Sequence, residues 1–345
     1  MKRMLTTGLA LAALVVAAVV ATPTPADACA GLIGSNGAVN LGRTTTLAGY
    51  HDGVEHYVTA FQFLGGGGEF GTLIPLPGVP SSVERGGAWT LQRLVRETDP
   101  PLEFLARSDV APAAAGAEVL LQTRIDALDI TVLKGGAPDV AAWAKDHGFR
   151  LSPDAPEVLD FYAQRSPIFL AAIFDGDAAK KRGQRIGDGT PVHITIPTSN
   201  PWVPLRILAL GKQPADRVEA DVFLLTDAVP SLMPGSRDGL NLTHSQRASK
   251  SLLNDLRADD GMGWIPATAW LTRLRIDSRA ADLRYDLAVD ASGRGAPSPV
   301  AAGLVSPAAL TEDGSIEGAL YGGAAAAATA FAFALVVARF LRRQA

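Results

Sequence analysis

The sequence contains one cysteine, Cys29, among its 345 residues. One cysteine cannot form a disulfide bond within its own chain, so the fold depends on its apolar core for stability. Only five histidines are present, which limits the metal sites that imidazole groups can build. The formal net charge is −4, and an acidic chain of this kind is not expected to bind nucleic acid.

Motifs for nucleotide binding and acyl transfer are also missing, and we expect no cofactor. No G-K-[ST] loop occurs, and Gly66–Gly71 fits G-x-G-x-x-G in form but precedes a strand pattern with prolines instead of a helix. Gly235–Gly239 reads GSRDG, which is not the order of a nucleophile elbow. Because a Ser, a His and an Asp that are distant in sequence can still meet in space, these absences leave catalysis open.

The first 28 residues are typical of a secretory signal peptide. Lys2 and Arg3 precede an apolar stretch, and small residues allow cleavage after Ala28. Cleavage there would make Cys29 the first residue of the mature chain. A lipidation motif requires a small neutral residue where Asp27 stands, so we do not expect Cys29 to carry a lipid.

The end of the chain has the pattern of a membrane anchor. Residues 318–338 carry no charge and would form a helix of about 30 Å, the thickness of the hydrocarbon core of a bilayer. Three arginines follow in the tail 339–345, and basic clusters remain on the cytoplasmic side. We therefore predict a single-pass protein of the cell membrane, with its N-terminal domain outside the cytoplasm, its C-terminus inside and the membrane as its partner.

Between the two termini we expect an exported domain at 29–290 and a stalk at 291–317. Alanine, glycine, proline and serine dominate the start of the stalk, and this composition is typical of linkers. The domain is long enough to form one large or two small units with their own cores.

A β-hairpin is the strongest local prediction. Two strand patterns between Thr44 and Phe63 meet at Asp52-Gly53, a pair of residues that tolerates the positive φ angles of a two-residue turn. The alternation places Tyr57, Thr59, Phe61 and Phe63 on the core face. The next strand, 70–77, contains two prolines, so we expect it at a sheet edge.

The segments Tyr50–Glu55, Phe61–Phe63 and Phe70–Pro77 resemble the beginning of an exported bacterial family known as domain of unknown function 2330. Later segments at Gly189–Val192, Pro204–Ile207 and Leu271–Leu274 resemble that family too, so the similarity extends over most of 29–290. The resemblance implies no known activity, cofactor or site residue.

Further elements follow along the domain. We expect helices from 88 to an interruption at Asp99-Pro100, from a cap at Asp139 to Gly148, over 155–165, and after a capping box at Thr243–Gln246. Strands are expected at 130–133, 168–174, 191–196, 203–210, 220–226 and 264–276. Since the strands and helices do not alternate, the predicted fold is α+β and strand-rich, with two β subdomains as one arrangement, plus one C-terminal transmembrane helix.

Candidate metal ligands are few. His51 and His56 share one face of the hairpin and are close enough to bind Zn²⁺ or Cu²⁺ together, but no third ligand is visible nearby, so we predict no metal site. His193 lies between two inward-facing residues and is expected to point the other way. Asp175, Asp177 and Asp188 share a loop with four basic residues, which favours a solvated loop over a Ca²⁺ site.

These observations favour a non-catalytic domain that binds a ligand or partner at the outer face of the cell membrane. A membrane-tethered enzyme, such as a metal-dependent hydrolase that uses His51 and His56, is the first alternative. A structural component of an envelope complex is the second.

Overall fold

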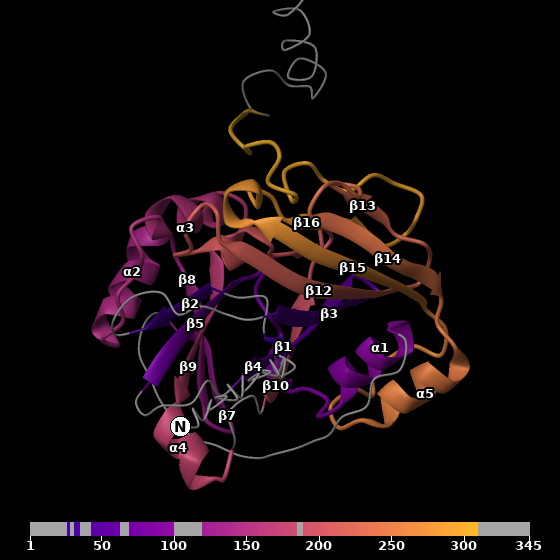
Figure 1. Ribbon diagram of the computed structural model, residues 1–345, viewed down its shortest axis with the longest axis horizontal. Coiled ribbons are helices and arrows are strands. Elements are labelled where there is room, and N and C mark those ends of the chain that lie inside the picture. The colour runs from indigo at the N-terminus through magenta and orange to yellow at the C-terminus, as the bar shows by residue number, and fades with distance from the viewer. Residues whose placement is uncertain are drawn as a thin grey trace, which may run out of the picture.

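The computed structural model describes residues 26–27, 31–34, 43–62, 69–99, 119–184 and 189–309 (Figure 1). Most of the predicted signal peptide, Cys29, the predicted helix at 318–338 and the tail at 339–345 lie outside these residues. Ala26 and Asp27 of the predicted signal peptide form β1, which pairs in parallel with the start of β3 (Arg43–His51). Cleavage after Ala28 would remove this pairing.

The largest sheet has the strand order β14-β15-β12-β3-β4-β10-β6, with β1 beside β3. Its pairs are antiparallel except those of β3 with β1 and with β12. The bounds of the other strands are β4 Val54–Gln62, β6 Ser82–Arg85, β10 Gly189–Pro197, β12 Arg217–Thr226, β14 Leu240–Arg247 and β15 Trp270–Arg279.

Two further sheets complete the described strands. An antiparallel five-stranded sheet has the order β2-β5-β9-β8-β7, and a three-stranded sheet has the order β11-β16-β13. Their bounds are β2 Gly31–Gly34, β5 Glu69–Pro75, β7 Val119–Ile125, β8 Leu128–Lys134, β9 Ile168–Asp175, β11 Trp202–Val203, β13 Ser231–Met233 and β16 Leu287–Asp290.

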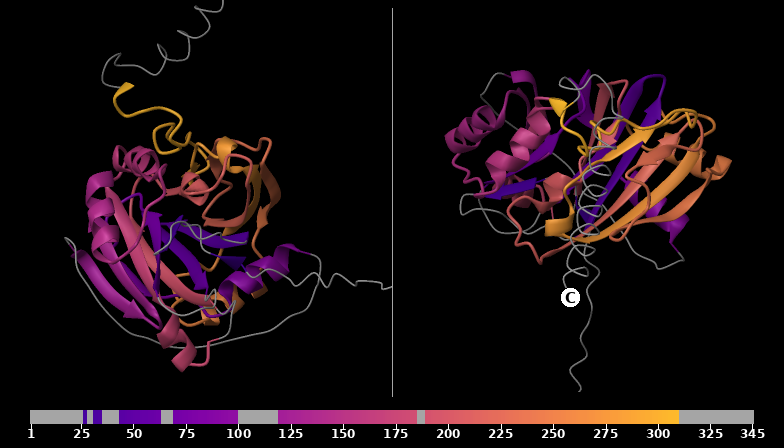
Figure 2. Two further views of the ribbon diagram at one scale, coloured as in Figure 1. Left: turned by 60° about the vertical axis from the view of Figure 1, so that its left-hand side comes forward. Right: turned by 90° about the horizontal axis from the view of Figure 1, so that it is seen from above.

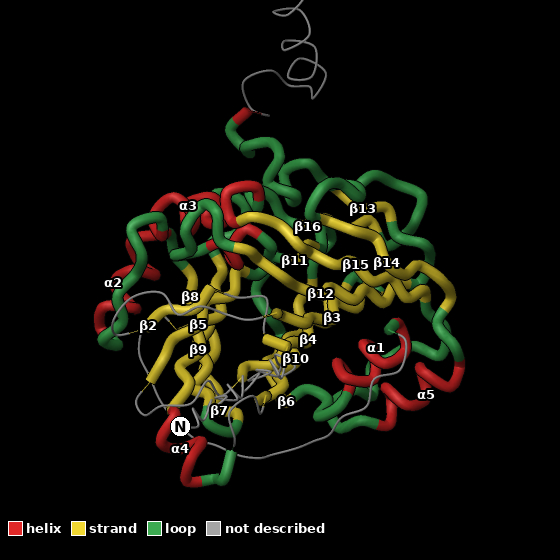
Figure 3. The backbone as a smooth tube through the Cα atoms, in the orientation of Figure 1, coloured by secondary structure: helices red, strands yellow, loops and turns green. Residues whose placement is uncertain are grey.

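The helices cover the outer faces of the two larger sheets. In Figure 3, α2 and α3 lie beside β8 and β5, whereas α1 and α5 lie at the other side of the molecule. Figure 2 likewise shows the magenta α2 and α3 opposite the orange β14 and β15. The helix bounds are α1 Thr90–Thr98, α2 Ala137–Asp146, α3 Ala155–Ala163, α4 Gly176–Lys181 and α5 Lys250–Ala258, with 3-10 helices at Arg206–Ala209 and Ala280–Asp282.

One central core joins the two larger sheets. It contains Tyr57 of β4 and Val222 of β12 from the first sheet, together with Ile130 of β8 and Leu170 of β9 from the second. Because both sheets contribute to the same cluster, the arrangement as two β subdomains was wrong. Two smaller clusters lie outside this core, one beneath α2 and α3 and one beneath α1 and α5.

The predicted hairpin is confirmed. β3 and β4 pair in antiparallel register with His51 opposite Val54, and Asp52 and Gly53 have φ angles of 49° and 77°. The predicted core face is confirmed for Tyr57, Thr59 and Phe61, which are all buried, while Phe63 lies outside the described residues. The other face of β4 is not open to solvent, since α1 and α5 cover part of it.

Three of the predicted elements were wrong. β5 lies between β2 and β9 and is therefore not at a sheet edge. The segment 203–210 is strand only at Val203 and then turns into a 3-10 helix, because the backbone N–H groups of Leu205 and Arg206 donate to the buried carboxylate of Asp286 at 2.7 and 3.0 Å. Thr243–Gln246 forms part of β14, where pairing with β15 outweighs the local capping pattern.

Two helix starts also differ from the prediction. The last long helix, α5, begins after Ser249, whose hydroxyl accepts from the N–H of Leu252 at 3.1 Å. In α2 the N-cap is Gly136, and the carboxylate of Asp139 accepts from its N–H at 2.8 Å. Both acceptors satisfy backbone donors that the first helical turn leaves free.

The first part of the predicted stalk packs against the domain. Ala301 and Ala302 are buried in the cluster beneath α2 and α3. The Nη1 group of Arg165 donates to the carbonyl of Ala301 at 2.6 Å, and the N–H of Asp286 donates to that of Ala302 at 2.9 Å. The folded domain therefore extends beyond the predicted boundary at 290.

The predicted fold class was also wrong in its C-terminal transmembrane helix. No helix in the described part of the chain is long and apolar enough to cross a membrane, and the segment 318–338 on which the prediction depends lies outside it. The corrected description is an α+β, strand-rich fold of packed sheets with helices on their outer faces.

Candidate functional site

The central strand β4 places two unusual residues on opposite faces of the large sheet. Glu55 and His56 are neighbours in sequence, so their side chains point to opposite sides. Glu55 lies opposite Tyr50 of β3 and Ile196 of β10, while His56 lies opposite Gly49 and Thr195. Each side chain enters a different environment.

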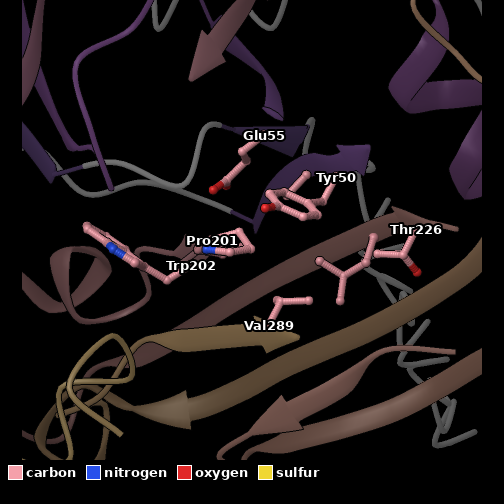
Figure 4. A pocket seen from close by; sticks show the side chains of 9 residues that line it. Tyr50, Glu55, Pro201, Trp202, Thr226 and Val289 are labelled. Carbon is pink, nitrogen blue, oxygen red and sulfur yellow. The ribbon is translucent and has the colours of Figure 1, made fainter. Parts of the chain in front are cut away.

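Glu55 faces a small pocket between the large and the three-stranded sheets. Its residue surface is only 1% exposed, and neither carboxyl oxygen forms a hydrogen bond of normal geometry with any described residue. Figure 4 shows its carboxyl group pointing into the space bordered by Tyr50, Pro201 and Trp202. The pocket is lined by Ala48, Tyr50, Glu55, Pro201, Trp202, Val203, Leu224, Thr226 and Val289.

The pocket is small and mostly apolar. It measures about 220 Å³, including space that is open to solvent, and its enclosed part has room for a single water molecule. The Tyr50 hydroxyl donates to the carbonyl of Thr198 at 2.8 Å, and the Thr226 hydroxyl donates to that of Ala228 at 2.7 Å. The polar neighbours of Glu55 are thus already engaged elsewhere.

Burial raises the pKa of Glu55 from 4.5 to about 8, and a weak hydrogen bond from the backbone of Trp202 has a smaller effect in the opposite direction. Glu55 is therefore protonated near pH 7. Burial also raises the pKa of the Tyr50 hydroxyl, with smaller contributions from the charges of Glu55 and Asp290. The pocket thus contains a carboxylic acid that can donate a hydrogen bond or give up its proton.

His56, on the other face, pairs with His193 of β10. Nδ1 of His56 and Nε2 of His193 are 2.9 Å apart and share a hydrogen bond. The Thr195 hydroxyl lies 3.4 Å from the same Nε2 atom. His193 is only 4% exposed, so this pair belongs to the interior of the sheet face rather than to its surface.

The indole of Trp264 covers both imidazoles. Its ring centroid is 4.0 Å from that of His56, with the planes inclined by 2°, and 5.5 Å from that of His193. Gly49 provides the space for the indole, because a Cβ atom at that position would lie 2.4 Å from Cη2 of Trp264. Any residue other than glycine there would displace Trp264.

Burial lowers the pKa of both histidines from 6.5 to about 4. For His56 the charge of His51 adds to this effect, and for His193 the charge of His56 does so. Both imidazoles are therefore neutral near pH 7 and have an unprotonated ring nitrogen available.

The structure pairs the predicted metal candidates differently. Nδ1 of His51 lies 2.7 Å from Oδ1 of Asp227, and its Nε2 lies 3.3 Å from Oδ2 of Asp52. His56 finds its partner in His193, 137 residues away. No group of three or more His, Cys, Asp or Glu residues in the described ranges is arranged to hold a metal ion.

The predicted acidic loop contains a helix cap. The carboxylate of Asp175 accepts from the N–H groups of Asp177 and Ala178 at 3.0 and 2.8 Å. Asp177 lies 3.8 Å from the ammonium group of Lys180. Asp188 lies outside the described residues. In these contacts, the partners of the two described carboxylates are protein groups: backbone N–H groups for Asp175 and the ammonium group of Lys180 for Asp177.

Two further clusters of buried charged residues, around Asp286 and around Arg273, are held by ion pairs and hydrogen bonds. Asp286, which is fully buried, accepts from the Tyr162 hydroxyl at 2.8 Å and from Arg165 at 2.5 Å. Arg273 donates to Asp221 at 2.9 Å and to Asp99 at 2.8 Å. Because all these charges are paired, we assign both clusters to the stability of the fold.

A comparison with protein families gives one match. The model of a family described as "Uncharacterized protein conserved in bacteria (DUF2330)" matches residues 16–228. This chain belongs to that family. The matched part of this DUF2330 member includes Glu55, His56 and His193 and ends before Trp264. A comparison with curated proteins finds no match.

Solved structures of baculovirus P35 are distantly similar to this DUF2330 chain. The crystal structure of baculovirus P35 is 10% identical and covers 72% of this chain and 96% of its own, with a TM-score of 0.39. A mutated baculovirus P35 after caspase cleavage is 9% identical and covers 73% of this chain and 98% of its own, with a TM-score of 0.40. Similarity at this level supports no conclusion about function.

Proposed function

We propose that this protein is an exported, non-catalytic binding domain and that the pocket at Glu55 holds its ligand. The supporting observation is the Glu55 carboxyl group, which is buried, makes no hydrogen bond of normal geometry beyond a weak contact with the backbone of Trp202, and faces an unfilled space. A buried polar group that is left without a good partner destabilises a protein by up to about 1–3 kcal/mol. Polar groups that are buried without a good partner and have a strongly shifted pKa are concentrated at binding sites.

The chemistry of the pocket favours a small organic cation. Glu55 offers a carboxylate once it loses its proton, and none of the lining residues is basic. The rings of Tyr50 and Trp202 border the same space, and aromatic faces attract ammonium groups. Because Glu55 is protonated near pH 7, a cation that binds beside it would displace a proton into solution.

The proposed location outside the cytoplasm comes from the signal-peptide pattern of residues 1–28. Sequencing the N-terminus of protein purified from cells tests it, and we expect the mature chain to begin at Cys29. An unprocessed Met1, in cells that process other secreted proteins, would contradict export by this route.

Methylammonium chloride is a suitable probe for the pocket because it carries one ammonium group and one methyl group. We expect it to raise the melting temperature of the purified full chain at pH 7 by a few degrees more than sodium chloride at equal ionic strength, since it binds the folded state. In weakly buffered solution, a pH indicator should report about one proton released per ligand bound.

Two variants test the assignment to Glu55. Glu55→Gln keeps the shape of the side chain but cannot become negative, so both the methylammonium effect and the proton release should disappear. Glu84→Gln, at an exposed position on β6, is the matched control and should leave both unchanged. An equal effect on wild type and Glu55→Gln, or none on wild type, would show that Glu55 does not bind cations.

A further inference from the structure

The pair formed by His56 and His193 brings two imidazole nitrogens within 2.9 Å of each other. In zinc sites the metal–nitrogen distance is about 2.0–2.1 Å, which places two ligand nitrogens about 2.9 to 3.4 Å apart for angles between 90° and 110°. The observed separation of Nδ1 and Nε2 is 2.9 Å. The two nitrogens are therefore already at the spacing that one metal ion requires, at the lower end of the range.

We propose that His56 and His193 bind one divalent transition-metal ion, with Cu²⁺ preferred. Imidazole nitrogen suits both copper and zinc, and the Irving–Williams order gives Cu²⁺ the higher affinity at a given site. The separation of 2.9 Å corresponds to a right angle at the metal, which fits the tetragonal geometry of Cu²⁺ better than the tetrahedral geometry of Zn²⁺.

Binding requires no net loss of protons from the pair. In the metal-free protein, one of the two facing nitrogens carries the hydrogen that forms the bond between the rings. When a metal ion takes its place, that hydrogen moves to the other nitrogen of the same ring, and both facing nitrogens then donate their electron pairs. Each ring must also turn so that its electron pair, which lies along the line between the two nitrogens in the hydrogen bond, is directed toward the ion.

The ion would keep open positions. The Thr195 hydroxyl lies 3.4 Å from Nε2 of His193, and within the described ranges no third His, Cys, Asp or Glu joins the pair. Water would fill the remaining positions. His51 stays outside this site, because its Nδ1 atom is engaged with Asp227.

Trp264 gives this site a spectroscopic signal of its own. Its indole is stacked on His56 at 4.0 Å, so Cu²⁺ bound to the pair would lie close enough to quench its fluorescence. We expect Cu²⁺ at pH 7 to quench part of the tryptophan fluorescence of the purified full chain at a 1:1 ratio. In Trp264→Phe that part of the quenching should vanish, while the electron paramagnetic resonance signal of bound Cu²⁺, with splitting from two nitrogens, should remain.

Replacement of each ligand completes the test. His56→Gln and His193→Gln should each weaken Cu²⁺ binding by more than about 100-fold, because the loss of a residue that only supports a ligand weakens metal binding by about 10–100-fold. His147→Gln is the matched control, because His147 is also stacked on a tryptophan, Trp143, at 4.5 Å, and its Nδ1 atom lies 2.8 Å from the carbonyl oxygen of that residue. His51→Gln should also bind normally.

Circular dichroism distinguishes a lost site from a lost fold in the two ligand variants. Folded variants that still bind Cu²⁺ with wild-type affinity would overturn the proposal. A paramagnetic resonance spectrum of the wild type without nitrogen splitting from two ligands would also overturn it, and that measurement does not depend on any variant folding. Since this site and the Glu55 pocket lie on opposite faces of β4, each proposal can fail without the other.

Discussion

The two faces of β4 show how one physical cause produces opposite changes in adjacent residues. Burial raises the pKa of Glu55 to about 8 and lowers that of His56 to about 4, so both side chains are neutral near pH 7. Their environments differ in one respect. His56 is hydrogen-bonded to His193 and stacked under Trp264, whereas the carboxyl group of Glu55 makes only a weak contact with the backbone of Trp202.

This contrast predicts how stability varies with pH. Glu55 holds its proton in the folded state up to a pKa of about 8 but loses it near 4.5 when unfolded, so its contribution to stability is lost as the pH rises from 4.5 through 8. His56 and His193 have lowered pKa values, so their contribution is lost as the pH falls from 6.5 through 4. Between 4.5 and 6.5 the two histidines outweigh the single acid, so these three groups together place maximum stability near pH 6.5.

The largest expected effect comes from removing the acid. Each unit of pKa corresponds to about 1.4 kcal/mol, so ionisation of buried Glu55 should destabilise the wild type by several kcal/mol at pH 9. Glu55→Gln cannot ionise and should therefore be more stable than the wild type at pH 9, with a far smaller difference at pH 5.5. Urea denaturation at both pH values measures this.

Glu84→Gln serves as the control here too, because Glu84 is exposed and should change stability little at either pH. If wild type and Glu55→Gln lost the same stability between pH 5.5 and 9, the raised pKa of Glu55 would be disproved.

An intermediate effect is expected from His193 in the metal-free protein. Between pH 6.5 and 4.5 the wild type should lose about 2–3 kcal/mol on account of this residue, because protonation is favoured only after unfolding. His193→Gln should be less stable than the wild type at pH 7 but should lose less on acidification. The free energy of unfolding at three pH values shows the difference.

His51→Gln, at a half-exposed histidine on the same sheet face, gives a graded comparison. Because the charge of His51 helps to lower the pKa of His56, this variant should lose slightly less stability on acidification than the wild type, but more than His193→Gln does. If the wild type lost no stability between pH 6.5 and 4.5, or if His193→Gln lost as much as the wild type, the lowered pKa of His193 would be contradicted.

The smallest expected effect is steric and concerns the cover of the histidine pair. In Gly49→Ala the new Cβ atom would lie 2.4 Å from the indole of Trp264, so the ring must move and stability should fall by about 1–3 kcal/mol. The fluorescence emission of Trp264 should shift as its packing changes. In Gly235→Ala, where no atom lies within 4 Å of the new group, stability and emission should stay the same.

Local patterns predicted the elements well where the chain determines its own conformation. The Asp52-Gly53 turn fixed the hairpin register, and the interruption at Asp99-Pro100 matches the end of α1 at Thr98. Prediction failed where pairing with a strand distant in sequence determines the conformation of a segment. Thr243–Gln246 has the pattern of a helix start, yet the segment becomes a strand: the register shifts at Thr243, and the three residues that follow it pair with β15.

The candidate sites show the same division. The alternation that placed Tyr57, Thr59 and Phe61 inward also places Glu55 inward, so the sequence contained the signal for a buried acid. The expectation that His193 points away from its inward neighbours agrees with its place beside His56. What no local pattern supplies is that β10 lies next to β4, which brings these two histidines together.

The order of the large sheet has a consequence for when this protein can fold. β3 and β4 occupy its centre, but their outer neighbours β12 and β10 are made more than 120 residues later. The edge of β4 gains its partner β10 only when residue 197 has been synthesised, and the edge of β3 gains β12 only at residue 226. Contacts this distant in sequence form slowly. Late completion of the large sheet suits the export proposed above, because that sheet is still open while the chain is extended enough to pass through a narrow channel.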